Sequence, residues 1–260
     1  MNKTALVTGA SSGIGRELAT IHAASGGDVV LVARSTSELE DLKAELESAH
    51  KITATAISKD LSAPGAGQAV YDEVTQAGIT VDYLINNAGF GGVGLFHEQD
   101  WEKNNSMIQL NIVALSELTR AFLPGMIENK SGRILNVSST AGYLPGPMQA
   151  VYFATKAYVT SFSLAIAEEL RDTNVTVTAL LPGPTDTQFG STSGMDKTSM
   201  FSNPHSPTEV AQAGYDAMLD GELSVIAGVS FGQKLFMKLI PFVPKGILLK
   251  QVKKMQQTQG

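Results

Sequence analysis

Tyr152 and Lys156 lie four residues apart in the alanine-rich stretch "VYFATKAY" (151–158). Four residues are just over one helical turn, so on a helix both side chains leave the same face. A free tyrosine has a pKa of about 10 and is too weak an acid at neutral pH to exchange protons efficiently. A lysine ammonium held nearby favours the phenolate and lowers that pKa. The spacing therefore predicts either a proton-transfer pair or an ordinary helix-surface contact.

A second stretch with chemical meaning is the glycine-rich "TGASSGIG" (8–15). It follows an apolar run typical of a strand and precedes a helical pattern. Glycines let the backbone approach a pyrophosphate closely, and the N-terminus of a helix offers unpaired N–H groups and a favourable dipole. Many glycine-rich loops are only turns, but this position between a strand and a helix favours a dinucleotide-binding loop.

The elements that hold these residues alternate regularly between strand and helix. The runs that predict strands are 3–8, 28–33, 52–58, 82–86, 133–138, 175–181 and 223–228. Helical periodicity covers 13–25, 37–49, 65–77, about 99–128, 150–171 and 207–219. Continuous apolar strands are covered on both faces, and steady alternation indicates a parallel sheet with right-handed crossovers. We predict one doubly wound α/β domain over residues 1–230.

The order of the motifs resembles the short-chain dehydrogenase/reductase family, in its compact single-domain branch. The glycines follow T-G-x-x-x-G-x-G rather than the common G-x-G-x-x-G. The other matching motifs are "KDL" (59–61), "NNAG" (86–89), "LNIV" with Asn111, "VSSTAG" (137–142), Tyr152 with Lys156, and "PGPTDT" (182–187). The resemblance covers about residues 3–228. It implies a Rossmann-type fold, with a mostly seven-stranded parallel sheet and helices on both faces, and oxidation or reduction with a nicotinamide cofactor.

The end of the second predicted strand bears on the choice of cofactor. An acidic residue there would bind the ribose 2′-OH of NAD, but the sequence has Ala33 followed by Arg34. Arginine pairs bidentately with phosphate, so NADP(H) is favoured over NAD(H), with a solvated Arg34 as the alternative. Ser12 stands where many NADP-dependent relatives carry a second basic residue. The resemblance implies cofactor contacts by Gly9, Ser11, Ser12, Gly13, Ile14, Gly15, Arg34, Asp60, Leu61, Asn87, Ala88, Gly89, Tyr152, Lys156, Pro182, Gly183, Thr185 and Thr187.

The resemblance also implies the catalytic roles. Tyr152 would give a proton to a carbonyl oxygen, or take it back in alcohol oxidation, and Lys156 would lower the tyrosine pKa and bind the nicotinamide ribose. The family spacing, thirteen residues before the tyrosine, selects Ser139 to bind the substrate oxygen. Ser138 should point to the opposite side. Asn111 would hold a water that relays protons from Lys156, with a core amide in a kinked helix as the alternative.

The segment 188–206, rich in serine, threonine and glycine, matches the position of the family's substrate-covering segment. Seven side chains are candidates for an apolar pocket: Phe90, Tyr143, Leu144, Met148, Phe189, Met195 and Met200. Such a pocket would suit a large ketone or a fatty-acyl-like substrate. The same residues also pack ordinary loops.

Residues 231–260 form a basic amphipathic extension beyond the resemblance. Six lysines and no acidic residue follow Glu222, and apolar residues recur at helical spacing. Pro241 and Pro244 should divide the segment into two short helices. Three interpretations stay open: a helix pair packed on the body, a weak contact with an anionic membrane surface, and an oligomer contact.

Composition excludes several function classes. The chain has no cysteine, which rules out disulfides and thiolate zinc sites, and its four histidines are far apart, so we expect no metal. A net charge of -6 argues against nucleic-acid binding. A strand pattern begins almost at Met1 and no long apolar run follows, so we expect neither a signal peptide nor a membrane span, and a cytoplasmic location.

These observations predict an NADP(H)-dependent oxidoreductase that acts on a carbonyl or secondary alcohol, and the family resemblance implies a homodimer or homotetramer. A non-catalytic NADP(H) sensor and an NAD-dependent alcohol dehydrogenase are the alternatives.

Overall fold

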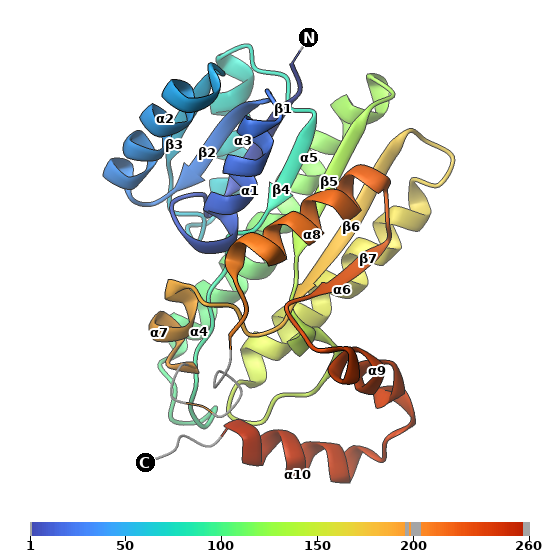
Figure 1. Ribbon diagram of the computed structural model, residues 1–260. Coiled ribbons are helices and arrows are strands. Elements are labelled where there is room, and N and C mark those ends of the chain that lie inside the picture. Colours follow the sequence, from blue (N-terminus) through green and yellow to red (C-terminus); the bar gives the residue numbers. More distant parts are fainter. Residues whose placement is uncertain (1, 196–197, 199–203, 257–260) are drawn as a thin grey trace.

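A parallel sheet forms the centre of the molecule. The structure is a computed structural model that describes residues 2–195, 198 and 204–256. Within these residues the sheet has seven strands, in the order β3-β2-β1-β4-β5-β6-β7 (Figure 1). The strands are β1 (Thr4–Thr8), β2 (Asp28–Ala33), β3 (Ala54–Ser58), β4 (Tyr83–Asn86), β5 (Gly132–Val137), β6 (Val175–Pro182) and β7 (Ser224–Ala227). The predicted strands and the doubly wound fold are therefore confirmed.

Helices cover both faces of the sheet, as the continuous apolar strands require. One face packs on α1 (Gly13–Ala24), α2 (Thr36–His50) and α8 (Pro207–Asp220). The other packs on α3 (Ala66–Gln76), α5 (Leu115–Glu128) and α6 (Ala150–Glu169). Successive residues of β1 divide between the two cores, because Ala5 and Val7 face the first and Leu6 faces the second.

The strand order reverses beside β1, since β1 pairs with β2 on one side and with β4 on the other. In open α/β sheets, ligands bind outside the carboxyl ends of the strands at such a switch point. The glycine-rich loop follows β1 at this place. The topology therefore positions the predicted site.

Two helical stretches are long and apolar enough to cross a membrane by length and composition, Trp101–Glu128 and Ala150–Glu169. The first is continuous from α4 (Trp101–Ile108) through a π-helical turn (Gln109–Ala114) to α5, and the second is α6. Both pack against the sheet core, where buried helices are commonly apolar on most sides.

The C-terminal segment forms two short helices, α9 (Phe231–Leu239) and α10 (Lys245–Gln256), joined by a 3₁₀ turn (Ile240–Phe242). The break at Pro241 and Pro244 is as predicted. Both helices lie beyond the carboxyl ends of the strands, at the same end of the molecule as α7 (Gln188–Ser193) (Figure 1). Leu248 and Val252 of α10 join Tyr152 and Phe153 in a third apolar cluster. This part of the chain is thus packed on the domain that carries the predicted site.

Candidate active site

The glycine-rich loop has the geometry of an anion cradle. Gly9 and Gly13 have φ angles of 64° and 53°, a region that favours glycine. A Cβ on Gly15 would lie 2.2 Å from the carbonyl oxygen of Gly9, so the tight turn leaves no room for a side chain. Ser12 precedes α1 without capping it through its side chain, and no acidic residue lies in the first turn. The helix dipole and the N-terminal amides therefore favour an anion at this loop.

The end of β4 holds the loop in place. The Asn87 side-chain amide donates to the carbonyl oxygens of Thr8 (2.9 Å) and Gly9 (3.3 Å). The Thr8 hydroxyl accepts from the backbone N–H groups of Asn87 and Ala88. The Asn87 side chain, after β4, thus binds the backbone at the end of β1, so the motifs "TG" and "NNAG" form one structural unit.

Arg34 follows β2 and is exposed, with its side chain at the edge of the cavity. Lys59 lies at the same edge, and Glu38 also lines it. Asp60 accepts from the backbone and the hydroxyl of Ser62, and these hydrogen bonds, with a smaller effect of Arg34, lower the pKa of its carboxyl. Lys59 also pairs with Glu73 at 3.7 Å. The exposed Arg34, with no carboxylate at position 33, makes this edge suitable for a phosphate.

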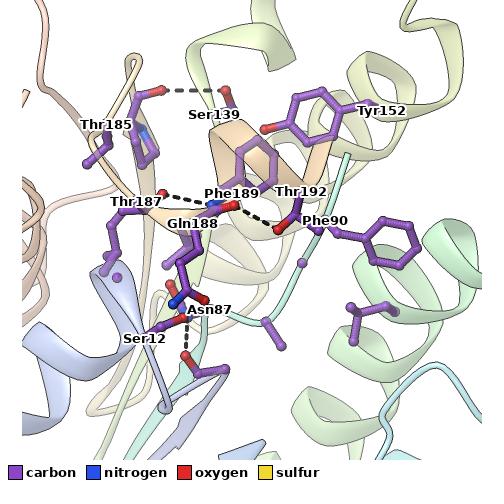
Figure 2. Close-up of a pocket in the computed structure, with 18 of the residues that line it drawn as sticks. Ser12, Asn87, Phe90, Ser139, Tyr152, Thr185, Thr187, Gln188, Phe189 and Thr192 are labelled. Carbon is purple, nitrogen blue, oxygen red and sulfur yellow. Dashed lines mark hydrogen bonds between the residues drawn. The ribbon is translucent and has the colours of Figure 1, made fainter. Parts of the chain in front are cut away.

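Ser139 and Ser138 point to different partners. The Ser139 hydroxyl accepts from the backbone N–H of Ala141 (3.1 Å) and lies 3.5 Å from the carbonyl oxygen of Pro182. Figure 2 shows it turned toward the same part of the pocket as the Tyr152 hydroxyl. The Ser138 hydroxyl is instead buried against α6, where it donates to the carbonyl oxygen of Lys156 (2.8 Å). Of the two serines, only Ser139 presents its hydroxyl group beside Tyr152.

Tyr152 and Lys156 lie on one face of α6, as their spacing predicts, and both are buried. The Lys156 Nζ donates to the carbonyl oxygen of Val137 (2.9 Å) and lies 5.9 Å from the centre of the Tyr152 ring. Burial lowers the pKa of Lys156 to about 8. Burial raises the pKa of Tyr152 to about 12, and the hydrogen bond with Ser139 opposes this rise only in part.

The expected lowering of the tyrosine pKa is therefore not found. The expectation counted the attraction between the ammonium and the phenolate but not the loss of water around the phenol. Apolar rings surround Tyr152, with Phe189 at 5.5 Å and Phe153 at 6.1 Å between ring centres. In this setting the cost of desolvating the phenolate outweighs the opposing effect of the Ser139 hydrogen bond.

Asn111 lies in the π-helical turn between α4 and α5 and is buried. Its side-chain oxygen accepts from the N–H of Phe90, and its amide donates to the carbonyl oxygen of Phe90 and to the Thr155 hydroxyl. The amide thus fixes the backbone after "NNAG" and links it to α6. π-Helical turns often occur at functional sites. The proton-relay role of Asn111 stays a prediction.

The loop after β6 lies on the other side of the site, next to the glycine-rich loop. A Cβ on Gly13 would come within 2.9 Å of the Thr187 methyl group, so the glycine loop and this segment nearly touch. Thr187 caps α7 by accepting from the N–H of Phe189 (3.3 Å), and the Thr185 hydroxyl donates to the carbonyl oxygen of Gly183. Figure 2 shows Thr185, Thr187 and Phe189 around the same pocket as Ser139 and Tyr152, so this segment lines the cavity.

All of these parts line one cavity of about 510 Å³. Every predicted site residue lines it except Gly15, which lies beneath the loop, and the buried Asn111. Of the candidate apolar residues, Phe90, Phe189 and Met195 line it, whereas Tyr143, Leu144 and Met148 do not. Met200 lies outside the described residues.

Sequence reasoning missed an amide pair at this cavity. Gln149 and Gln256 are both buried, line the cavity, and are joined by a hydrogen bond from the Gln149 Nε2 to the Gln256 Oε1. Within the described part of the chain, the Gln149 Oε1 has no hydrogen-bond partner. The two residues are 107 positions apart, so no local pattern could have indicated the pair.

Three comparisons with known proteins bear on the family. The chain is 38% identical over 177 residues to a very-long-chain 3-oxoacyl-CoA reductase of Laccaria bicolor, covering 66% of this chain and 52% of that protein. A short-chain dehydrogenase from Sphingobium yanoikuyae in complex with NADPH has 30% identity and a TM-score of 0.82, covering 93% of this chain and 96% of the other. A bulky-bulky ketone specific alcohol dehydrogenase from Comamonas testosteroni has 27% identity and a TM-score of 0.77, covering 94% and 95%.

The matched region spans only about half to three fifths of the length of the first curated relatives. The family model described as short chain dehydrogenase matches residues 3–198, which include the glycine-rich loop, Ser139, Tyr152 and Lys156. With a sheet of the same architecture around these motifs, the chain belongs to the short-chain dehydrogenase family.

Proposed function

We propose that the chain is an NADP(H)-dependent oxidoreductase that reduces the carbonyl group of an apolar substrate. The observation that carries this proposal is the convergence of the Ser139 and Tyr152 hydroxyls in one cavity with the buried Lys156. Their hydrogen-bonding groups lie at the carboxyl ends of the strands, beside the anion cradle.

The cavity fits a dinucleotide along its length. The cradle formed by Gly9 and Gly13 at the start of α1 suits the pyrophosphate, and Arg34 suits a 2′-phosphate. Gly89 keeps the path toward the catalytic residues open, because a Cβ there would lie 3.1 Å from the Asn111 Oδ1 and 3.4 Å from the Lys156 Nζ. The NADPH bound to the similar Sphingobium protein supports the same assignment.

When bound, the nicotinamide would supply the hydride, and the protein would position the substrate and provide the proton. The Ser139 hydroxyl would donate to the carbonyl oxygen and stabilise the charge that develops there. Tyr152 would transfer its proton to the same oxygen. With a pKa raised to about 12, the phenol is protonated at neutral pH and so carries the proton that carbonyl reduction requires. The Lys156 ammonium would stabilise the phenolate that results.

The walls around Tyr152 favour an apolar substrate. Phe90, Phe189 and Met195 line this part of the cavity, and Phe153 packs beside them. The similar proteins described as reducing very-long-chain 3-oxoacyl-CoA or as specific for bulky ketones agree with a large substrate. We therefore infer a ketone with a long or bulky apolar group, and we take residues 1–230 as the catalytic domain.

The test is NADPH oxidation at 340 nm against ketones of increasing apolar size, with Tyr152→Phe compared with the wild type. Loss of the phenol should lower kcat by about 10²–10⁴-fold without changing NADPH binding. Tyr158→Phe is the matched control, because Tyr158 lies on the same helix and its hydroxyl pairs with Ser116, away from the cavity. NADPH binding without turnover of any ketone would instead favour the sensor, and preferred use of NADH would favour the NAD-dependent alternative.

A further inference from the structure

The outward face of α9 is apolar where a packed helix would be polar. Phe231, Leu235 and Leu239 of α9, followed by Phe242 in the 3₁₀ turn, have exposed fractions of 83%, 52%, 50% and 83%. An amphipathic helix in a globular protein normally turns such a stripe toward the core. Ile247 at the start of α10 continues the exposed apolar surface, with 61% exposed.

The same segment also packs inward through a second apolar face. Ile240, Leu248 and Val252 are buried in the cluster that contains Tyr152 and Phe153, and Gln256 lines the active-site cavity. Because the packing of the segment on the domain is already provided by these residues, the outer stripe is not needed to hold the two helices in place.

The same two helices carry exposed lysines: Lys234 on α9, and Lys245, Lys250, Lys253 and Lys254 on α10. None of the ion pairs formed within the described residues includes any of these five. All 25 acidic residues of the chain lie at or before Glu222, whereas the six basic residues after it are all lysines. The molecule therefore has an acidic body and a basic, apolar end.

We propose that the outer face of α9 and α10 docks on the surface of an anionic phospholipid bilayer. Apolar side chains entering the headgroup region, with lysines beside the lipid phosphates, are the features of an interfacial helix. The acidic body would be repelled by the same surface, which orients the basic end toward it. Two-fold pairing of two copies through this face would instead place like charges opposite each other, which disfavours a second copy as the occupant.

Docking in this orientation places the wall of the active-site cavity that α10 forms against the bilayer. The inner face of α10 contacts the cluster around Tyr152, so α10 lies between the catalytic residues and the lipid. Resting on the proposed function, this inference narrows the substrate to apolar carbonyl compounds that partition into membranes. Such a substrate would reach the cavity without crossing bulk water.

The first experiment measures binding of the full-length protein to sedimented vesicles, which requires no turnover. Vesicles of phosphatidylcholine with phosphatidylglycerol should bind the protein, pure phosphatidylcholine should bind it at least tenfold less, and added salt should weaken binding. Phe231→Ser with Phe242→Ser should lower binding to the anionic vesicles by more than tenfold. Leu223→Ser is the matched control, since Leu223 is 59% exposed but precedes β7, at the opposite end of the sheet.

Equal binding to neutral and anionic vesicles, no binding, or unchanged binding of the double variant would overturn the proposal. Circular dichroism and NADPH turnover of a water-soluble ketone would show whether the double variant is folded. Vesicle binding by a protein that turns over no ketone would leave the docking face supported and refute the oxidoreductase assignment. Turnover of a ketone without vesicle binding would support the oxidoreductase assignment and refute the docking face.

Discussion

Replacing Lys156 with methionine should remove a buried charge that destabilises the folded protein. Methionine has a similar length and no charge, so it can fill the same space on α6. Burial lowers the pKa of Lys156 from 10.5 to about 8, which means that the folded state holds this proton less tightly than the unfolded chain does. At 1.36 kcal/mol per pKa unit, keeping the ammonium at pH 7 costs about 3 kcal/mol of unfolding free energy.

The variant also loses a favourable contact. Lys156 donates to the carbonyl oxygen of Val137, and leaving a buried acceptor without this donor costs about 1–3 kcal/mol. At pH 7 the two effects nearly cancel, so we expect Lys156→Met to be between equally stable and about 2 kcal/mol more stable than the wild type. The variant should have lost reductase activity.

The pH dependence separates the two effects. Between pH 8 and 10.5 the unfolded chain binds more protons at Lys156 than the folded protein does, so wild-type stability should rise with pH in this window. From pH 7 to pH 9.5 this group contributes about 2 kcal/mol of added stability, which Lys156→Met cannot gain. The advantage of the variant should therefore disappear or reverse at pH 9.5.

Urea unfolding of both proteins at pH 7 and 9.5 measures this difference directly. Lys103→Met is the control, because Lys103 is exposed on α4 and its loss should change stability little at either pH. A stability difference between wild type and Lys156→Met that stays constant with pH would refute the reasoning that burial depresses the lysine pKa.

Three further outcomes follow from the cavity. Arg34→Ala should raise the KM for NADPH about tenfold or more and leave the KM for NADH within about twofold, and equal effects on both would contradict a 2′-phosphate contact. Ser139→Ala should lower kcat by about 10²–10³-fold with unchanged NADPH binding, whereas Ser138→Ala should mainly lower the melting temperature; the opposite result would exchange their roles. Gln149→Leu removes a buried acceptor without a partner in the described residues but also the hydrogen bond to the Gln256 Oε1, so stability should fall by about 1–3 kcal/mol, while the KM should change only for ketones with a remote polar group. Calorimetry and a substrate panel would check this last outcome, and a uniform KM change would argue against it.

Most of the fold could be predicted from periodicity, because strands and helices repeat their apolar positions locally. The glycine-rich loop, the seven strands and the division of the C-terminal segment at Pro241 and Pro244 all follow from residues that are close in sequence. The placement of Tyr152 and Lys156 on one face follows from the helical turn alone.

Other features depend on surfaces that meet only in the folded chain. The pKa of Tyr152 is set by desolvation, to which Phe189 of α7 and other separate elements contribute, so the sequence pair alone predicted the wrong direction. The partnership of Gln149 with Gln256 and the two apolar faces of α9 and α10 likewise depend on how the C-terminal segment packs on the domain. Local spacing determines which side of an element a residue occupies, whereas burial and electrostatics depend on what that side contacts, and only the tertiary structure decides this.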